Sequence, residues 1–446
     1  MIAISNYYRR GNNLSLIPHN FFPIIFLGTS RLVSSISMSS SDPFAPLSEP
    51  QAYTPPDFAA RLPDPPVSRL FLSSRPTPIH PLVLPDRPAV VSKVLVKRDD
   101  HTGGLEMGGN KIRKLDFLLA DALSRECGAV VTIGGVMSNH CRATACAARA
   151  VGIDPHLVLR TRESETDRLH GLVGNVLFGR LAAASVWTCT PGAYGRFGSH
   201  AILKKVAGMM EAERPYIIPV GGSNALGSWG YIEAVDELLH QMENRDMPDY
   251  IVLATGSGGT LAGIVVGLLL AEETGRIKYS PQIHAVGVCD NPEYFYKTVT
   301  SIITDMGYVS PVTKEDIANR VRRILVVHQG KGRGYAISTS EELNFVKKVA
   351  ATTGLVLDPV YTGKALHHFL NVVVEQDKKL FEGKTVLYWH TGGGLGVFDK
   401  VPELQCWEEG HEESEKSIGK CGGELDVTSP IRKVDMYKDV HPTASS

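Results

Sequence analysis

A lysine that directly follows a glycine turn is the residue in this chain best suited to covalent chemistry. Residues 108–111 read Gly-Gly-Asn-Lys, and Lys111 stands at the start of a segment whose apolar residues recur with helical spacing. Glycines let a backbone pass close to a ligand, and a lysine amine displayed there can form a Schiff base with a carbonyl cofactor. The alternative is a surface loop that Lys111 and Lys114 keep solvated. The rest of the chain must decide between a catalytic amine and a solvated surface loop.

The turn at 255–260 is the clearest anion site in the sequence. Its residues are Thr255, Gly256, Ser257, Gly258, Gly259 and Thr260. The glycines allow consecutive N–H groups to converge at a helix N-terminus, and hydroxyls flank them, so the turn suits one phosphate group. A nucleotide suits it less well, because there is no Walker lysine and Leu261 replaces the third glycine of a dinucleotide fingerprint. A tight turn without a ligand remains the alternative.

A second strand-to-helix turn ends in Ser138, Asn139 and His140. Its N–H groups and the Ser138 hydroxyl could bind a substrate carboxylate, and Asn139 could donate to a phenolic oxygen of a cofactor. Simple N-capping is the alternative. Tyr335 and Tyr361 lie in loop-like sequence, where isolated tyrosines are usually packing residues. Whether these tyrosines act in a site therefore depends on their neighbours.

Strand and helix patterns alternate along most of the chain. Strands are expected at 91–96, 130–133, 157–159, 186–188, 217–220, 251–254, 283–288, 324–327 and 386–389. Helices are expected near 115–127, 139–150, 174–181, 230–239 and 261–272. Several of the strand segments are apolar throughout, which is typical of strands buried on both faces. This order predicts an α/β fold with open, mainly parallel sheets.

Composition limits the class of ligand. The chain has 446 residues, 43% of them hydrophobic, which is enough for two domains or one large composite unit. A formal charge of −1 provides no basic field for nucleic acid or an anionic membrane, so a small-molecule substrate is expected. No apolar run reaches the length of a membrane span. The seven scattered cysteines contain no C-x-x-C pair, which favours reduced thiols, and Cys141 is interpreted as a packing residue rather than a nucleophile.

The two ends differ in composition from the middle. Residues 1–41 contain no Asp or Glu, carry three arginines and end in a serine-rich run, which is the profile of a transit peptide. Mitochondrial targeting is therefore expected, and a start at Met38 would instead leave the product in the cytoplasm. Residues 42–85 are rich in proline and predict an extended arm. Residues 403–446 predict a charged, loosely attached tail.

The motifs together resemble those of the pyridoxal-phosphate (PLP) enzymes of fold-type II, the tryptophan synthase β-like group. Within it they are most similar to the branch of 1-aminocyclopropane-1-carboxylate deaminase and D-cysteine desulfhydrase. The likeness covers roughly residues 70–400. Its carriers are Gly-Gly-Asn-Lys at 108–111, Ser-Asn-His at 138–140 followed by Arg142, Gly-Ser-Gly-Gly-Thr at 256–260, Asp-Pro-Val-Tyr-Thr-Gly-Lys at 358–364 and His-Thr-Gly-Gly at 390–393.

The resemblance implies a role for each candidate residue. PLP would lie in the cleft between a large domain (86–117 and 229–402) and a small domain (118–228). The family also implies a homodimer, and no metal is expected. Lys111 would hold PLP, Asn139 would bond its phenolic oxygen, and residues 255–260 would bind its phosphate. Thr391 would also contact the cofactor, and Thr362 would face the pyridine nitrogen. Ser138, Tyr335 and Tyr361 would act on a substrate whose carboxylate is held by Ser138, Asn139 and His140.

Thr362 favours one activity of the branch. The deaminases have a glutamate there that keeps the ring nitrogen protonated, and a neutral hydroxyl makes the ring a weaker electron sink, which suits prompt β-elimination. The chain is therefore expected to be a cysteine desulfhydrase that releases hydrogen sulfide, pyruvate and ammonium from D- or L-cysteine or both. The alternatives are the deaminase or another amino-acid lyase, an NAD(P)-dependent oxidoreductase and a silent binding protein. Met137 stands where the branch commonly has glutamine, which leaves the substrate range open.

Overall fold

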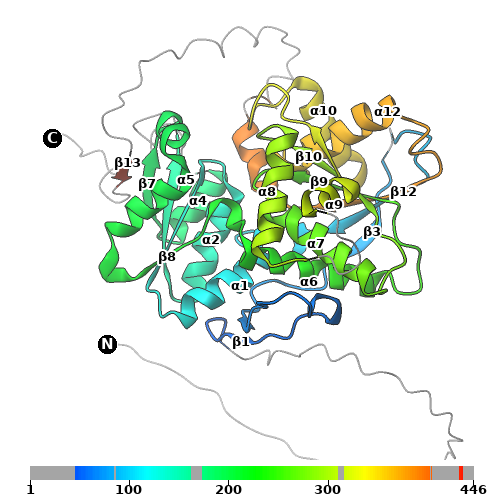
Figure 1. Ribbon diagram of the computed structural model, residues 1–446. Coiled ribbons are helices and arrows are strands. Elements are labelled where there is room, and N and C mark those ends of the chain that lie inside the picture. Colours follow the sequence, from blue (N-terminus) through cyan, green and yellow to red (C-terminus); the bar gives the residue numbers. More distant parts are fainter. Residues whose placement is uncertain are drawn as a thin grey trace, which may run out of the picture. The chain divides into compact units, whose positions relative to one another are not determined.

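The computed structural model describes residues 46–84, 87–161, 173–309, 316–401, 403 and 431–434. The predicted transit peptide lies outside these residues, as does most of the predicted tail. Two main sheets organise the described chain, and Figure 1 shows them side by side, with helices α1 (Lys111–Ser124) and α6 (Ala225–Gln241) near their junction. Within the described residues, no helix combines the length and apolar character needed to cross a bilayer.

The larger sheet has six strands in the order β11-β10-β9-β12-β4-β3. Their bounds are β3 (Ile79–Pro81), β4 (Lys93–Arg98), β9 (Tyr250–Thr255), β10 (Gln282–Gly287), β11 (Leu325–Gln329) and β12 (Thr385–His390). Neighbouring strands are parallel except at the edge, where β3 is antiparallel to β4. Every residue of β9 is buried, as expected of a central strand covered on both faces.

The smaller sheet has the order β13-β7-β6-β5-β8. Its strands are β5 (Ala129–Gly135), β6 (Asp154–Arg160), β7 (Ser185–Cys189), β8 (Pro215–Ile217) and β13 (Ile431–Val434). All pairs are parallel except β13, which runs antiparallel to β7. The charged composition of residues 403–446 did not indicate β13, so four residues of the predicted tail belong to a sheet.

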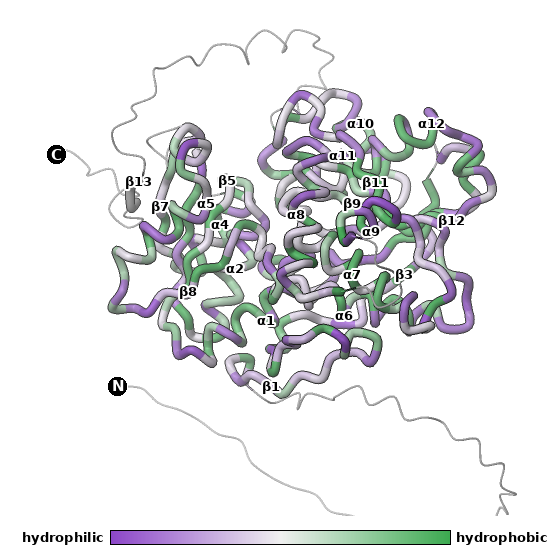
Figure 2. Tube along the Cα trace, viewed as in Figure 1, coloured by the Kyte–Doolittle hydropathy of each residue, from purple (hydrophilic) through white to green (hydrophobic). Residues whose placement is uncertain are grey.

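Helices accompany both sheets. Those in the segment of the small sheet are α2 (Asn139–Ala150), α4 (Gly174–Leu181) and α5 (Pro191–Gly208). Those in the segment of the large sheet are α7 (Gly259–Glu273), α8 (Pro292–Asp305), α9 (Ile317–Ile324), α10 (Ser340–Thr353), α11 (Thr362–His368) and α12 (Val374–Gln376). Short turns of other helix types include η4 (Val220–Gly222) and η6 (Gly394–Lys400). In Figure 2 hydrophobic colour follows much of the strands and α7, and hydrophilic colour is common in the outer loops.

Close helix packing fixes the position of α1. A Cβ at Gly230 of α6 would lie 2.1 Å from the Arg113 carbonyl oxygen of α1, so only glycine allows this approach. A Cβ at Gly263 of α7 would lie 2.4 Å from the Ser228 carbonyl oxygen of α6. Helix α7 is buried from Gly259 to Ala271, so α6 and α1 are anchored on an apolar core.

The predicted arm is more ordered than an extended segment. Strands β1 (Gln51–Ala52) and β2 (Ser68–Arg69) form a small antiparallel pair, and Tyr53 and Phe58 enter the hydrophobic core of the large sheet. Strand β3, at the end of this segment, is part of the large sheet itself. The strands of this segment thus divide between a small antiparallel pair and the large sheet. The predicted domain boundaries at 117/118 and 228/229 stay predictions.

Candidate active site

A cavity of about 560 Å³ is lined by residues at the carboxyl ends of strands from both sheets. Residues from the ends of β5, β6 and β9, and the segment after β12, contribute to its wall. The predicted site residues that line it are Lys111, Ser138, Asn139, His140, Thr255, Gly256, Ser257, Gly258, Thr260, Tyr335, Tyr361 and Thr391. Gly259 and Thr362 are the predicted site residues that do not line it. Carboxyl ends of parallel strands are the usual position of ligands in open α/β sheets.

Asn110 joins the lysine turn to the glycine turn at 255–260. Its Nδ2 donates to Thr260 Oγ1 (3.0 Å), its Oδ1 accepts from Lys111 Nζ (3.1 Å), and its backbone N–H donates to the Thr391 carbonyl (3.0 Å). Gly109 has φ of 110°, and a Cβ there would lie 3.2 Å from the same carbonyl. The two stretches therefore meet although about 150 residues separate them. Asn110 has this bridging role without having been predicted as a site residue.

Two buried amines, Lys111 in the cavity wall and Lys114 one helical turn on, lack negative partners among the described residues. Burial, and then the charge of Arg142, lower the pKa of Lys111 to about 8. Burial, and then Lys111, lower the pKa of Lys114 well below its ordinary value, and its Nζ donates to the Gly221 carbonyl (3.1 Å). Neither amine forms an ion pair with any described residue. A cavity whose wall contains the Lys111 amine without a carboxylate partner suits an anionic ligand.

His140 takes part in the site as a neutral ring. Burial and the two lysines lower its pKa well below the ordinary value. Its Nε2 is 2.8 Å from Thr132 Oγ1, which ties the start of α2 to strand β5. The imidazole is therefore better suited to positioning this turn than to carrying charge toward a carboxylate.

Arg142 clamps the loop that precedes Lys111. Its Nη1 and Nη2 donate to three carbonyls of the loop 105–108 at 2.6–3.0 Å. Its Nε donates to Asn175 Oδ1 (3.0 Å), and Asn175 Nδ2 donates to the Met137 carbonyl (3.0 Å). Arg142 and Asn175 thus connect the lysine loop to the Ser138 turn. Only proximity in the fold reveals the contribution of Asn175.

The glycine turn is organised by a loop that was not predicted to take part. Gly259 N–H donates to Ser223 Oγ (3.1 Å), and Ser223 Oγ donates to Ser257 Oγ (2.8 Å). A Cβ at Gly259 would lie 2.7 Å from the Ser223 Cα. Gly259 therefore serves close packing in this structure, and its predicted contact with a phosphate stays a prediction. Gly258 has φ of 81°, which brings the turn back toward the cavity.

Asn139 has a buried polar atom left for a ligand. Its Oδ1 has no hydrogen-bond partner among the described residues, although the residue lines the cavity. A Cβ at Gly393 would lie 2.9 Å from Asn139 Nδ2, so glycine is needed to leave room for the amide. A buried amide without partners costs free energy unless a ligand pairs with it.

The two tyrosines form one unit. Tyr335 Oη and Tyr361 Oη are 2.6 Å apart, and burial raises the pKa of Tyr335 to about 12 and that of Tyr361 well above its ordinary value. Both are therefore neutral near pH 7. One hydroxyl donates to the other, so one proton remains for a ligand.

Asp358 holds the backbone beside this pair. Its Oδ1 accepts from the N–H groups of Tyr361 and Thr362, the latter at 3.2 Å. Thr362 is fully buried, and its Oγ1 accepts from the Asp358 N–H (2.7 Å). Because this hydroxyl is occupied by the backbone and lies outside the cavity wall, the predicted contact of Thr362 with a pyridine nitrogen stays a prediction.

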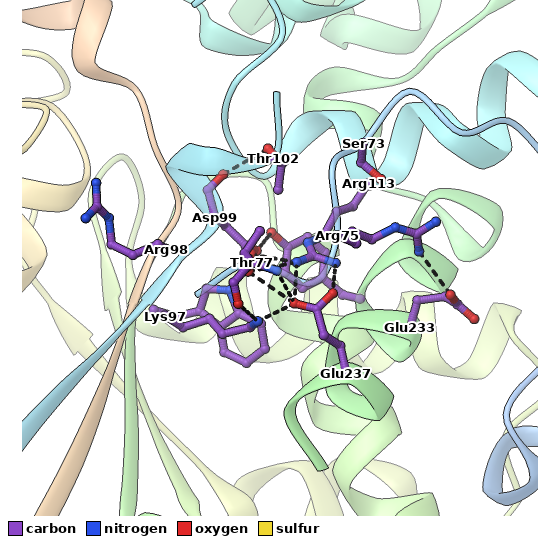
Figure 3. A network of polar contacts seen from close by, with 12 residues as sticks. Ser73, Arg75, Thr77, Lys97, Arg98, Asp99, Thr102, Arg113, Glu233 and Glu237 are labelled. Carbon is purple, nitrogen blue, oxygen red and sulfur yellow. Dashed lines mark hydrogen bonds and ion pairs between the residues drawn. The ribbon is translucent and has the colours of Figure 1, made fainter. Parts of the chain in front are cut away.

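A paired polar network surrounds Arg113 of α1 (Figure 3). Arg113 follows Lys111 by two positions, about half a helical turn, so it lies on the opposite face of α1. Arg113 Nη2 donates to Asp99 Oδ1 (2.8 Å) and Glu237 Oε1 (3.0 Å), and Lys97 Nζ also bonds Glu237. Burial favours a raised pKa for Asp99, but Arg113 and Lys97 lower it to about 2. Tyr231 and Trp389 each donate to Asp99 Oδ2 at 2.7 Å. The network anchors α1 from behind.

Comparison with known proteins decides the family. Residues 70–392 match the family described as pyridoxal-phosphate dependent enzyme. The chain belongs to this family. The predicted fold-type II architecture and the predicted PLP cofactor are therefore confirmed, and the oxidoreductase alternative loses its support.

Individual relatives in the PLP family cover most of the chain. The sequence is 44% identical over 375 residues to the Arabidopsis thaliana protein named bifunctional D-cysteine desulfhydrase/1-aminocyclopropane-1-carboxylate deaminase, mitochondrial, which covers 83% of this chain and 89% of the relative. It is 34% identical to a D-cysteine desulfhydrase of Klebsiella pneumoniae, over 75% of this chain and 97% of that one. A crystal structure described as an ACC deaminase homologue matches with a TM-score of 0.64 and 33% identity, over 79% of this chain and 99% of that one.

Proposed function

We propose that the chain is a PLP-dependent β-elimination lyase that converts cysteine, as the D- or L-enantiomer or both, into hydrogen sulfide, pyruvate and ammonium. The observation that carries the proposal is the bridge through Asn110, which brings the Lys111 amine and the glycine turn at 255–260 to one cavity. Two relatives with desulfhydrase in their names support the substrate class.

The cavity has the groups that PLP needs. Lys111 would bind its carbonyl carbon, Asn139 its phenolic oxygen, and the turn at 255–260 its phosphate, with Thr391 beside them. Asn139 lines the cavity, so its Nδ2 could donate to the phenolic oxygen, and the Lys111 amine has no carboxylate partner among the described residues, which fits an anionic cofactor. When bound, PLP supplies the electron sink for breaking bonds at the substrate Cα.

The residues of this chain would then bind substrate and move protons. Ser138 Oγ accepts from the Cys141 N–H (3.1 Å), which leaves its own O–H free for the substrate carboxylate. Lys111, with its pKa lowered to about 8, would take the Cα proton near neutral pH. The neutral pair of Tyr335 and Tyr361 has one proton available for the departing sulfur.

A substrate comparison tests the proposed activity. Purified holoenzyme is incubated with D-cysteine, L-cysteine and 1-aminocyclopropane-1-carboxylate, and sulfide and 2-oxobutyrate are measured in parallel. We expect sulfide and pyruvate in equal amounts from at least one cysteine enantiomer. Production of 2-oxobutyrate without sulfide would support the deaminase instead, which is the second candidate because the Arabidopsis relative carries both names.

We also propose a mitochondrial location and a homodimer. The acid-free leader at 1–41 and the name of the Arabidopsis relative support the location. The leader fused to a fluorescent protein should accumulate in mitochondria, whereas a fusion that begins at Met38 should stay in the cytoplasm. Light scattering on the purified full-length chain should give twice its mass of 48.5 kDa.

A further inference from the structure

Arg160 is a cation in the cavity wall that the proposed reaction does not use. It ends strand β6, is half-buried, and lies opposite Gly135 in the register of the sheet. Its guanidinium carbon lies 4.8 Å from the ring centroid of Tyr194 and 5.7 Å from that of Tyr335. Its side chain has no hydrogen bond or ion pair with any residue in the described part of the chain.

Contact with aromatic rings prepares this guanidinium for a ligand. Cation–π contacts use the flat face of the group and hold it in place. The N–H donors lie in the plane of the group, so they remain available for the two oxygens of a carboxylate or similar anion. An arginine that merely faced water would not need rings from α5 and from the Tyr335 loop to hold it.

The location of Arg160 suits a group of the substrate other than its α-carboxylate. The turn that begins α2 already offers Ser138 and its N–H groups for that carboxylate, as proposed above. Arg160 instead contacts Tyr194 of α5, which lines the cavity together with Ser199 and Tyr294. Asp290 also lines the cavity, but its Oδ1 accepts from the Asn291 N–H (2.8 Å) and it forms no ion pair with Arg160 among the described contacts.

We propose that Arg160 forms a subsite for an anionic group on the β-substituent of the substrate, so that the enzyme prefers β-substituted alanines whose leaving group carries a carboxylate. This inference rests on the proposed β-elimination. With S-carboxymethylcysteine, the Cα proton is removed, the Cβ–S bond breaks, and its electron pair leaves on sulfur, which is protonated to thioglycolate. Water then converts the three-carbon fragment to pyruvate and ammonium, and no oxidant or reductant is needed.

A pair of substrates of nearly equal shape tests the subsite. S-Carboxymethylcysteine and its neutral amide, S-carbamoylmethylcysteine, are compared in the cysteine configuration that the enzyme processes faster, and released thiol gives kcat/KM for each. We expect the wild-type enzyme to prefer the acid by about tenfold, and Arg160→Gln to bring the ratio within about twofold of one, because charge-assisted hydrogen bonds are lost. Arg160→Lys should keep part of the preference.

The controls separate this inference from the proposed function. Arg196→Gln removes an exposed charge that does not line the cavity, and it should keep the wild-type ratio. If the wild type releases sulfide from cysteine but shows no preference for the acid, accepts neither thioether, or keeps its preference in Arg160→Gln, the subsite is overturned and the lyase stands. An equal loss with cysteine, acid and amide would assign Arg160 to the α-carboxylate instead. If no substrate yields sulfide or thiol, both proposals fail.

Discussion

The two faces of helix α1 differ in whether their buried charged side chains have partners of opposite charge. Behind it, Arg113 is surrounded by the carboxylates of Asp99 and Glu237, and their mutual attraction offsets the cost of burial. In front, Lys111 lines the cavity and Lys114 lies behind it, bonded to the Gly221 carbonyl, and neither amine has a carboxylate partner among the described residues. Unpaired buried amines destabilise a fold unless a ligand compensates them. The difference teaches that the rear face fixes the helix, whereas the front face has an amine available for the anionic cofactor proposed above.

The largest expected effect comes from breaking the front face. Lys111→Ala should lower turnover of cysteine by about 10³-fold or more, because it removes the covalent amine and the proposed proton carrier. The thermal unfolding temperature should stay the same or rise, since a buried amine is lost. Lys205→Ala, an exposed lysine on α5, is the matched control. Full turnover in Lys111→Ala would refute the assignment.

Breaking the rear face should affect stability first. Arg113→Met leaves Asp99 and Glu237 without their shared cation, and we expect the free energy of unfolding to fall by about 3–5 kcal/mol. Denaturant unfolding measures this loss. Arg149→Met removes an exposed pair with Asp154 and should cost less than about 1 kcal/mol. Similar losses in the two variants would contradict the contrast between the faces.

The tyrosine pair tests whether neutral groups also belong to the front face. Tyr335→Phe removes one of two hydrogen-bonded hydroxyls, and kcat should fall by about 10²-fold with little change in stability. Tyr279→Phe, at an exposed position, should match the wild type. A change in stability alone would make the pair a packing feature.

The smallest effect concerns the pH at which Lys111 becomes reactive. Its pKa is lowered to about 8, so the rate of PLP uptake by the cofactor-free enzyme should rise as pH increases through about 8, where the neutral amine forms. Arg142→Gln removes a repelling cation, which raises the pKa of Lys111 and moves the profile to higher pH. Arg142→Lys loses the fork of hydrogen bonds but keeps the charge, so its profile should move less. Stopped-flow absorbance measures both.

Local pattern predicted the elements that are buried on both faces. The apolar runs at β5, β9 and β12 and the turns after them were predicted close to their positions, because burial there demands continuous hydrophobicity. Helices α8 and α10 were missed although cap signals exist. Asn291 accepts from the Tyr294 N–H, and Thr339 forms a capping box with Glu342. The cap residues Asn291 and Thr339 therefore indicate the starts of both helices in the sequence.

The contacts that complete the site depend on long-range packing. No sequence pattern predicts that Ser223 meets Ser257, or that Arg160 meets Tyr335, because the members of each pair are far apart in the chain. Helix α5, which brings Tyr194 to the cavity, has glycine at 198 with φ of 73° inside it, and its sequence lacks a clear helical period. Motifs therefore predicted turns that the structure brings to one cavity, whereas the residues that shape the rest of the cavity could not be predicted; the covalent and phosphate-binding roles stay proposals.

The order of the large sheet has a consequence for synthesis of the protein. Strand β4 pairs with β3 on one side and with β12 on the other, and β12 begins at Thr385, almost three hundred residues after β4 ends at Arg98. A ribosome delivers every parallel strand of the small sheet before it delivers β12. Until then one edge of β4 has no partner, and an open apolar edge invites association with other chains. Slow delivery of the last hundred residues should therefore make the nascent chain dependent on chaperones.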